Sequence, residues 1–389
     1  MTELTIASLA AGGDGVGRDD AGRVTFVPLT APGDRVRVEL SEQKKSFARG
    51  ELVEVLTASP DRVEPPCPYF KAGCGGCQWQ HVSRDAQLAA KHAIVVQAFK
   101  RLAVPVEPIV APAPPLGWRR RARFHVEAGR VGLYHRRTNR ILALAHCPQL
   151  EPALDAAYAA IVEAGRHAPL PDGDLALLRG HQGDIAIAFE RPWRAAATLV
   201  GKAGIVGILA GDVATGTTAI EVEPGLVGTP WDFAQASTDG NAALIGLARS
   251  ALGPGPGNLL ELYAGAGNFT RGFTADGWTV TPSDVVAPPR MPPRFHTGHA
   301  DRVLAQIIGR GKDTFDAIVL DPPRAGAAEA IDGIVKLAPK KLVYISCDPA
   351  TLARDATRLV EAGYRTERAW PLDLMPKTAH VEVVMQLAR

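Results

Sequence analysis

Apolar and polar positions alternate in short runs along the first 60 residues, with glycine and proline turns between the runs. A period of two is typical of strands that bury one face. The predicted strands are LTIASLA (4–10), RVTFVPL (23–29), DRVRVEL (34–40) and RGELVEVL (49–56), and GGDGVG and TAPGD are predicted turns. This spacing predicts a small antiparallel barrel over residues 1–60, which ends at the proline-rich DRVEPPCP.

The middle of the chain, residues 61–230, is predicted to form a second, mixed α/β domain. SRDAQLAAKHAIVVQAFKRL (83–102) carries apolar residues at helical spacing, and the proline-rich PVEPIVAPAPPLGW (105–118) follows as a connector. Weaker signals then predict one helix and two strands, at 151–165, 174–180 and 184–190.

From about residue 231 the pattern changes to helices alternating with apolar strands. The predicted strands are NLLELYA (258–264), GWTVTPSD (277–284), FDAIVLDPP (315–323), KLVYISCDP (341–349) and VEVVMQL (381–387). The predicted helices are NAALIGLARSAL (241–252), AAEAIDGIVKL (327–337) and TLARDATRLVEAG (351–363). Such alternation favours a doubly wound parallel sheet over residues 231–389.

A glycine-rich turn in ELYAGAGNFT follows one of these strands and indicates a nucleotide site. Gly265 and Gly267 let the backbone pass close to a ligand, and Asp284 at the end of the next strand is the candidate for ribose hydroxyls. A plain strand-to-helix turn explains the glycines equally well. In FDAIVLDPPRAG an apolar strand delivers Asp321 to the edge where ligands bind, and Arg324 stands where amine methyltransferases usually have an aromatic residue.

Cys347 stands between a predicted buried strand and a helix, and it is the candidate nucleophile. A helix N-terminus favours thiolate, although buried cysteines are usually inert. A thiolate that adds to carbon 6 of uracil makes carbon 5 nucleophilic toward a sulfonium methyl group. A general base must then remove the carbon 5 proton, and KTAHVEVV offers His380 and Glu382.

Composition and charge narrow the class of protein. With 389 residues and 46% hydrophobic residues the chain can bury a sizeable core, and no apolar run of 18 residues predicts a membrane span. The start lacks a signal-peptide pattern, so we expect a cytoplasmic protein. Net charge is only +2, yet residues 117–140 hold eight arginines and one acid, a patch that suits a phosphate backbone or is an ordinary solvated face.

Four of the five cysteines form a set with metal-ligand spacing. Three of them cluster as Cys67, Cys74 and Cys77, and Cys147 shares the Cys-Pro setting of Cys67. Four thiolates suit a cubane iron–sulfur cluster or structural zinc, and the three-plus-one spacing favours the cluster. Trp79, Trp118 and Phe233 are possible stacking groups for RNA bases, although core positions are the more common use of such side chains.

Together these residues resemble the bacterial RNA uracil-5-methyltransferases that carry an iron–sulfur cluster, of the 23S ribosomal RNA type. The N-terminal segment resembles the family's RNA-binding TRAM barrel, and CPYFKAGCGGCQWQH with HCPQL resembles its cluster site. WRRRARFHV resembles its basic stretch. ELYAGAGNFT, LDPPRAG, SCDPATLARD and KTAHVEVV match its catalytic motifs in order.

The resemblance implies a role for each matched position. It implies that Cys347 is the nucleophile and that Glu382 abstracts the proton. It also implies contacts to S-adenosyl-L-methionine, and these fall on Gln235, Tyr263, Asn268, Asp284 and Asp321. The implied ligands of a [4Fe-4S] cluster are Cys67, Cys74, Cys77 and Cys147. The expected partner is RNA, most simply 23S rRNA, and the expected state is a monomer without an obligate protein partner.

Some positions depart from the family pattern. Ser237 replaces a usual asparagine and Asp284 a usual glutamate, and residues 284–295 are short and proline-rich where a helix is usual. The adenine contact falls on either His299 or Asp301. Two other readings stay open: a transfer-RNA uracil-5 enzyme, whose branch usually lacks the barrel and the four cysteines, and a non-catalytic iron–sulfur RNA-binding protein.

Overall fold

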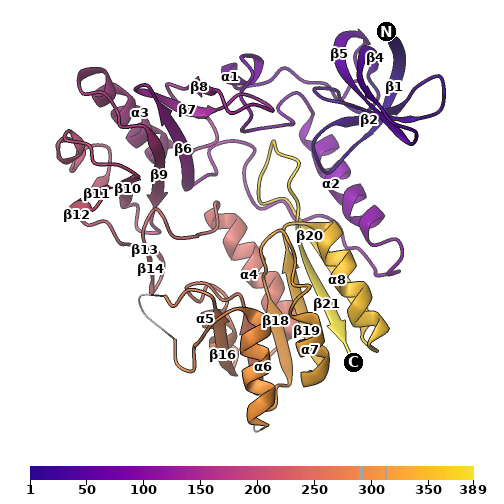
Figure 1. Ribbon diagram of the computed structural model, residues 1–389, viewed down its shortest axis with the longest axis vertical. Helices are drawn as coiled ribbons and strands as arrows, with labels where there is room; N and C mark the ends of the chain where they lie inside the picture. The colour runs from indigo at the N-terminus through magenta and orange to yellow at the C-terminus, as the bar shows by residue number, and fades with distance from the viewer. Residues whose placement is uncertain (289–291, 312) are drawn as a thin grey trace.

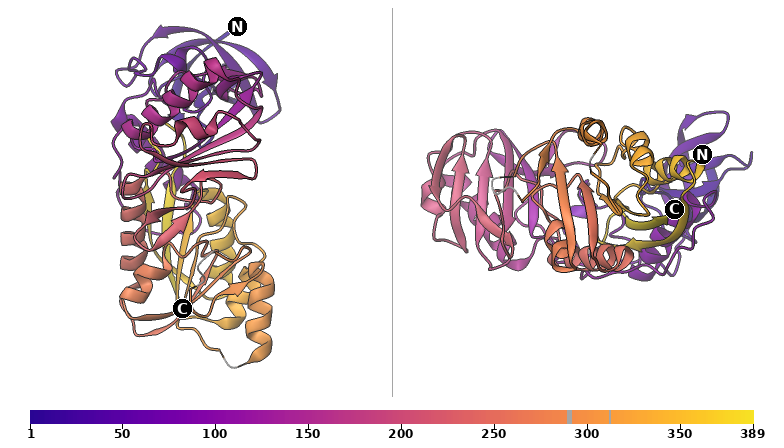
Figure 2. Two further views of the ribbon diagram at one scale, coloured as in Figure 1. Left: turned by 90° about the vertical axis from the view of Figure 1, so that its left-hand side faces the viewer. Right: turned by 90° about the horizontal axis from the view of Figure 1, so that it is seen from below.

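The computed structural model describes residues 1–288, 292–311 and 313–389. The molecule is elongated: a barrel and a mixed sheet lie at one end, and the C-terminal sheet with its helices lies at the other (Figures 1 and 2). Within the proline-rich stretch 284–295, residues 289–291 lie outside the described part of the chain.

The N-terminal residues form a closed five-stranded barrel in the order β1-β2-β3-β5-β4. Its strands are β1 (Thr2–Leu9), β2 (Gly15–Arg18), β3 (Val24–Val27), β4 (Arg35–Gln43) and β5 (Phe47–Thr57). The pattern predicted a turn where β2 stands, and it missed that β3 and β5 pair in parallel. A side chain at Gly15 would meet Thr30 Oγ1 at 2.0 Å. The glycines of this segment, which predicted a turn, therefore allow β2 to pack closely and complete the barrel.

The cysteine-bearing segment leads into a helix that packs on the C-terminal sheet. This segment contains the short helix α1 (Pro68–Lys71) and is followed by the predicted helix α2 (Arg84–Ala98). Ser83 is the N-cap of α2 and accepts a hydrogen bond from the Ala86 backbone. Val95 of α2 and Phe99 lie in the apolar core of the C-terminal sheet. The proline-rich connector then runs beside the sheet edge, with bridges from Val106 to Ala369 and from Val110 to Leu372.

A seven-stranded sheet in the order β12-β11-β10-β9-β6-β7-β8 occupies the middle of the chain. It is built from β6 (Arg121–Glu127), β7 (Arg130–Tyr134), β8 (Ile141–Ala143), β9 (Gly173–Arg179), β10 (Ile185–Phe189), β11 (Ile205–Ala210) and β12 (Val213–Gly216). Helix α3 (Pro152–His167) buries Leu154, Tyr158 and Ile161 in its core, together with residues of the short helix η1 (Ala196–Leu199). The hairpin of β13 (Ile220–Glu223) and β14 (Leu226–Gly228) follows.

The C-terminal sheet has the predicted parallel arrangement, in the order β17-β16-β15-β18-β19-β21-β20. The strands are β15 (Gly257–Leu262), β16 (Trp278–Asp284), β17 (His296–Thr297), β18 (Ala317–Leu320), β19 (Lys341–Ser346), β20 (Arg365–Leu372) and β21 (Glu382–Ala388). β15 to β19 run in parallel, and β21 runs antiparallel between β19 and β20. The helices are α4 (Thr238–Leu252), α5 (Thr270–Ala275), α6 (Ala300–Arg310), α7 (Ile331–Leu337) and α8 (Pro349–Glu361).

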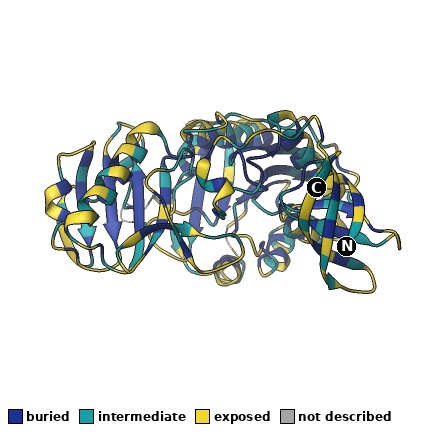
Figure 3. Cartoon of the chain, turned by 90° about the horizontal axis from the view of Figure 1, so that it is seen from above, coloured by how far each residue is buried: buried dark blue, intermediate teal, exposed yellow. Residues whose placement is uncertain are grey.

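Helices cover both faces of the C-terminal sheet, which explains why its central strands are apolar without alternation. One apolar cluster includes Leu260, Ile318 and Tyr344, and the opposite one includes Leu259, Val319 and Val343. The central strands of this sheet are accordingly buried along most of their length (Figure 3). Among the described residues, every helix is too short or too polar to cross a lipid bilayer.

Candidate active site

Three parallel strands of the C-terminal sheet deliver polar residues to one edge. Tyr263 follows β15, Asp321 follows β18 and Cys347 follows β19. Because parallel neighbours end at the same edge, these side chains are brought together although 84 positions separate the first from the last (347 − 263).

Glu382 reaches this edge because the last strand runs in the opposite direction. In the β19–β21 ladder Ser346 pairs with Val383, so the next residues outward are Cys347 and Glu382. The Glu382 side chain is buried, and its charge acts on the pKa of Cys347. The two residues expected to carry the chemistry therefore lie beside each other.

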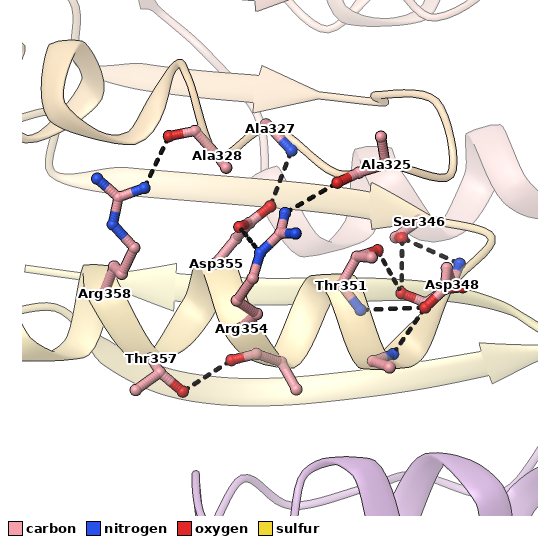
Figure 4. A network of polar contacts seen from close by, with 12 residues as sticks. Ala325, Ala327, Ala328, Ser346, Asp348, Thr351, Arg354, Asp355, Thr357 and Arg358 are labelled. Carbon is pink, nitrogen blue, oxygen red and sulfur yellow. Dashed lines mark hydrogen bonds and ion pairs between the residues drawn. The ribbon is translucent and has the colours of Figure 1, made fainter.

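The loop after Asp321 is fixed by helix α8, as Figure 4 shows. Arg354 donates to the Ala325 carbonyl oxygen at 2.9 Å, and Arg358 donates to the Ala328 carbonyl oxygen at 2.7 Å. The buried Asp355 accepts a hydrogen bond from the Ala327 backbone at 2.8 Å. Gly326 is required here, because a side chain at this position would meet Asp355 Oδ2 at 2.5 Å. The anchored loop carries Arg324 into the site.

The electrostatics of Cys347 differ from the expectation. Burial raises the pKa of the Cys347 thiol to about 11, Glu382 and Asp321 raise it further, and Arg324 opposes them. The N-terminus of α8 was expected to lower this pKa. Instead the Asp348 carboxylate caps the helix, accepting hydrogen bonds from the backbones of Ala350 and Thr351 at 3.0 Å each (Figure 4). The expectation of a lowered pKa at Cys347 is therefore wrong, because burial and the charges of Glu382 and Asp321 raise it.

Two carboxyl groups flank the thiol, and burial weakens the acidity of both. The pKa of Asp321 rises to about 7, chiefly through burial. The pKa of Glu382 rises well above its ordinary value through burial and the charge of Asp321, while Arg324 opposes the rise. A carboxylate with a raised pKa is a stronger base, which suits proton abstraction.

Arg324 and His380 complete this part of the site. The exposed Arg324 guanidinium lies 3.1 Å from His380 Nε2. Burial lowers the pKa of His380 to about 4, with a further contribution from Arg324, so the ring is neutral at pH 7. Of the two bases that the sequence left open, Glu382 is the stronger one in this environment. The pattern assigned no role to Arg324, although its place in LDPPRAG was a usable signal.

Three of the predicted cofactor residues, Tyr263, Asn268 and Asp284, lie in or against the glycine-rich turn. The Gly265 backbone donates to Asp284 Oδ2 at 2.8 Å. The side chains of Asn268 and Asn241 exchange two hydrogen bonds, at 2.8 and 3.0 Å. The Tyr263 hydroxyl donates to Glu329 at 2.7 Å. These contacts fix the turn at the sheet edge that also carries Asp321.

Gln235 lies in the loop before α4, and the basic stretch holds this loop in place. The Arg120 side chain is buried, forms an ion pair with Glu223 at 2.5 Å and donates to the Gln235 carbonyl oxygen at 3.1 Å. Ser237 caps α4 by accepting from the Gly240 backbone at 3.1 Å. A serine therefore serves as N-cap where the family usually has asparagine, since both residues favour this position.

The adenine contact is not decided by the position of either candidate. His299 is the N-cap residue of α6 and Asp301 lies in its first turn, and both are exposed. The choice between them stays a prediction.

Glu261 is a buried acid of this region that the pattern did not single out. Its side chain lies at the end of β15, is 1% exposed and accepts a hydrogen bond from Thr270 Oγ1 at 2.6 Å. Its second oxygen has no partner among the described residues. Burial raises the pKa of Glu261 to about 8, and Asp321 and Asp284 contribute. An acid within ELYAGAGNFT was the available signal.

The four remaining cysteines line one cavity of about 200 Å³, far along the chain from Cys347, and all are free thiols. Arg119 lines this cavity; burial lowers its pKa, and the charges of Cys147 and Cys77 oppose that shift. Burial also lowers the pKa of Arg136, and the charge of Cys74 opposes it. Arg136 Nη1 is buried without a hydrogen-bond partner among the described residues. Within the same residues, no group of three or more His, Cys, Asp or Glu side chains could hold a metal ion.

The arginine patch is more divided than its sequence indicated. Arg120 is buried, Arg119 and Arg123 line the cysteine cavity and Arg136 is half-buried, whereas Arg130, Arg137 and Arg140 are exposed. Strand alternation explains this division in part, because β6 turns Ala122 and Phe124 inward. Among the aromatic candidates, Trp79 and Trp118 are core residues, and only Phe233, which is 77% exposed, is available for stacking.

Comparison with known proteins identifies the family. The TRAM domain family matches residues 2–53, and the family described as tRNA (Uracil-5-)-methyltransferase matches residues 303–389. The 23S rRNA (uracil(1939)-C(5))-methyltransferase RlmD of Chromohalobacter salexigens is 33% identical, over 99% of this chain and 89% of that protein. The chain belongs to the RNA uracil-5-methyltransferase family. A second member, the RlmD protein of Pectobacterium atrosepticum, is 33% identical over 97% of this chain and 92% of that protein.

A solved structure of the family has the same fold throughout. It is the Pyrococcus abyssi tRNA (uracil-54, C5)-methyltransferase in complex with S-adenosyl-L-homocysteine, with a TM-score of 0.76, 21% identity, and coverage of 99% of this chain and 100% of that one. These findings confirm the predicted α/β methyltransferase fold with an N-terminal TRAM barrel. They also confirm the predicted enzyme class, an S-adenosylmethionine-dependent RNA uracil-5-methyltransferase.

Proposed function

We propose that this chain methylates carbon 5 of a uridine in 23S rRNA through a covalent bond to Cys347. The observation that carries the proposal is the β19–β21 register, which brings Glu382 beside Cys347 at the edge that also holds Asp321. The ribosomal target is supported by relatives named as 23S rRNA enzymes, which match 97–99% of the chain at 33% identity.

The first step requires the sulfur of Cys347 to add to carbon 6 of uracil. The carbon 5–carbon 6 double bond then becomes electron density on carbon 5, which attacks the methyl group. Arg324 favours this step, because its guanidinium acts against the charges that disfavour the thiolate. S-adenosylmethionine, when bound, supplies the electrophilic methyl group.

The second step removes the proton that carbon 5 still carries. Glu382 takes this proton, the carbon–hydrogen electron pair restores the double bond, and the bond from carbon 6 to the Cys347 sulfur breaks. A raised pKa makes Glu382 a suitable acceptor, and its burial keeps solvent from competing for the proton.

We propose that Gln235, Tyr263, Asn268, Asp284 and Asp321 hold the cofactor. The turn at Gly265 approaches a ligand with its backbone, and Asp284 stands at the strand end where ribose hydroxyls are held. One buried oxygen of Glu261 has no hydrogen-bond partner within the described ranges, and this supports a polar ligand in this region.

Methylation of defined transcripts tests the function and its target. The purified protein, incubated with S-adenosylmethionine and unmodified 23S rRNA, is expected to form 5-methyluridine at a discrete position, located by mass mapping. Unmodified tRNA serves as the competing substrate, because the solved relative is a tRNA enzyme. Methylation of tRNA alone would replace the ribosomal target, and no methylation of either RNA would favour a non-catalytic RNA-binding protein.

We further propose that Cys67, Cys74, Cys77 and Cys147 hold a [4Fe-4S] cluster. They line a common cavity with Arg119, and the charges of Arg119 and Arg136, which interact with these thiols, would balance part of the negative charge of four thiolates. A cubane binds each thiolate through a different iron atom, which suits four cysteines that line one cavity without forming a single-ion site among the described residues. Zinc needs its four ligands about 2.3 Å from a single ion. Uracil methylation moves no electrons, so the proposed role is structural.

Metal analysis of anaerobically purified protein tests this site. We expect about four iron and four sulfide per chain, with broad visible absorption from thiolate-to-iron charge transfer. The variant Cys147→Ser should lose iron, while Cys347→Ser should keep it. One zinc per chain without iron would overturn the assignment.

The proposed domain division is a TRAM barrel at 1–60, a cysteine-bearing central domain at 61–230 and the methyltransferase domain at 231–389. The sheets follow these divisions, although α2 of the central segment packs on the methyltransferase core. Action on ribosomal RNA supports a cytoplasmic location. A monomer remains the expected state, which light scattering of the purified protein would test.

A further inference from the structure

The loop that joins β20 to β21, residues 373–381, ends one position before Glu382. It carries His380, and its residue Lys377 has a φ of 65°, in the left-handed region that non-glycine residues rarely adopt. Such a conformation persists where surrounding contacts fix it. The contacts that fix this loop come from residues about 300 positions earlier in the chain.

The cysteine segment provides the first set of these contacts. The backbones of Gln78 and Trp79 donate to the Lys377 carbonyl oxygen at 3.1 and 2.9 Å. The Gln78 side-chain oxygen accepts from the Ala379 backbone at 3.3 Å. Gln78 directly follows Cys77, and Thr378 lines the cavity of the four cysteines. The loop before Glu382 is therefore hydrogen-bonded to the cysteine segment beside the cavity of the four cysteines.

Helix α2 provides a second set. Gln87 accepts from the Lys377 backbone at 3.0 Å and donates to the Trp79 carbonyl oxygen at 3.1 Å, so it connects the loop to the cysteine segment. Lys91 donates to the Met375 carbonyl oxygen at 3.1 Å, and its buried ammonium pairs with Asp373. Because Asp373 also pairs with Arg84, the start of the loop is fixed by two cations of the same helix.

The 373–381 loop also packs against apolar residues of the barrel. Ala379 belongs to a buried cluster with Trp79, Val82 and the barrel residues Leu9 and Ala31. The Trp79 indole donates to the Gly13 carbonyl oxygen at 2.9 Å. Ala379, three positions before Glu382, is therefore the point where the 373–381 loop contacts both the barrel and the cysteine segment.

We propose that the cysteine segment acts on the reaction by positioning Glu382, and that Gln78 is the positioning residue that transmits this effect. The inference rests on the proposed function. It assigns to the four-cysteine region a role in the proton-removal step, distinct from RNA binding. Gln78 suits this role because its side chain accepts a hydrogen bond from the loop backbone three positions before Glu382.

The proposal predicts which step fails when this contact is lost. Without the Gln78 side chain Cys347 still adds to carbon 6 and carbon 5 still accepts the methyl group. Removal of the carbon 5 proton then slows, so the methylated RNA stays bonded to the Cys347 sulfur. A general loss of folding would instead lower every step, and a role in RNA binding would raise KM.

The test compares Gln78→Ala and Gln78→Glu with wild type, with Gln97→Ala, at an exposed position of α2, as the matched control. Each is incubated with S-adenosylmethionine and unmodified 23S rRNA and run on a denaturing gel. For Gln78→Ala we expect a protein–RNA complex, a kcat lower by about 10-fold to 100-fold and a KM for RNA that falls with kcat, because the complex accumulates before the slowed step. Gln78→Glu keeps an accepting oxygen and should recover most of kcat, and Gln97→Ala should match wild type.

Hydrogen exchange gives a readout independent of catalysis. The peptide containing Ala379 should exchange faster in Gln78→Ala than in wild type or Gln97→Ala. Wild-type kcat in Gln78→Ala, or a lowered kcat without a trapped complex, would overturn the inference. If wild type itself methylates no RNA, the proposed function fails, and unchanged exchange at Ala379 would then refute the positioning role separately.

Discussion

Ser346 pairs with Val383 in the β19–β21 ladder, and this pair sets Glu382 beside Cys347. The register follows from the apolar runs of the two strands, both of which lie in the buried centre of the sheet. The proposed nucleophile and the proposed base, which are 35 positions apart (382 − 347), are therefore aligned by core packing. The predictions below depend on this proximity and on the burial that accompanies it.

Replacing Glu382 by glutamine should separate the two chemical steps. Glu382→Gln keeps the shape of the side chain and removes its basicity, so methyl transfer proceeds and proton removal is slowed by about 10²-fold to 10⁴-fold. On ordinary uridine RNA the variant should accumulate a methylated covalent complex, visible on a denaturing gel. Glu361→Gln, at an exposed position of α8, should behave as wild type. Normal turnover by Glu382→Gln would assign the base elsewhere.

The reactivity of Cys347 in the free enzyme should rise steeply with pH. Burial raises the pKa of this thiol to about 11, so its thiolate fraction grows about tenfold per unit between pH 7 and pH 9. Peptide mapping after iodoacetamide treatment should show the same rise in alkylation at Cys347. Arg324→Ala should slow alkylation at pH 8, because it removes the charge that lowers this pKa, whereas the exposed Arg310→Ala should not. A rate independent of pH would show a preformed thiolate.

Ionised Asp321 should lower the free energy of unfolding at neutral pH and above. Its folded-state pKa of about 7 exceeds the ordinary 3.8, so ionising this group as the pH rises from 4 to 7 favours the unfolded chain. Asp321→Asn should therefore raise the free energy of unfolding by on the order of 1–3 kcal/mol at pH 8 and leave it nearly unchanged at pH 4. Urea titrations at both values measure the difference. Destabilisation at pH 8 would show that a partner compensates the charge.

The cap of α8 should contribute measurable stability. Asp348→Ala removes the acceptor for two backbone N–H groups and should cost about 1 kcal/mol, whereas Asp348→Asn keeps an acceptor and should cost only a few tenths. Thermal unfolding of the three proteins at one pH measures the ranking. Equal losses in both variants would mean that the charge, and not the cap, matters.

Local patterns predicted those parts of the structure that depend on local burial. The apolar runs of β15, β18 and β19 identified the strands, and their order placed Tyr263, Asp321 and Cys347 at one edge. β2 was missed because position 15 requires glycine for a tertiary reason: it packs closely against Thr30, which lies in another part of the barrel. The burial of Arg120 was missed because its partner Glu223 lies 103 positions away.

Other features of the site depend on contacts that no local pattern contains. The Gln78–Ala379 hydrogen bond joins residues 301 positions apart. The pKa of Cys347 depends on Glu382, Asp321 and Arg324, which arrive on separate segments. The sequence placed Cys347 before a helix correctly, but the sign of its pKa shift required knowledge of what else is buried beside it.

Trapping with 5-fluorouridine tests the covalent account most directly. A base cannot remove fluorine from carbon 5 as it removes a proton, so the reaction should stop with the nucleotide still joined to the enzyme. Wild-type protein, incubated with S-adenosylmethionine and 5-fluorouridine-containing 23S rRNA, should yield a peptide carrying one methylated fluorouridine on Cys347, and Cys347→Ala should yield none. An adduct on another residue, or full methylation of ordinary RNA by Cys347→Ala, would contradict the account.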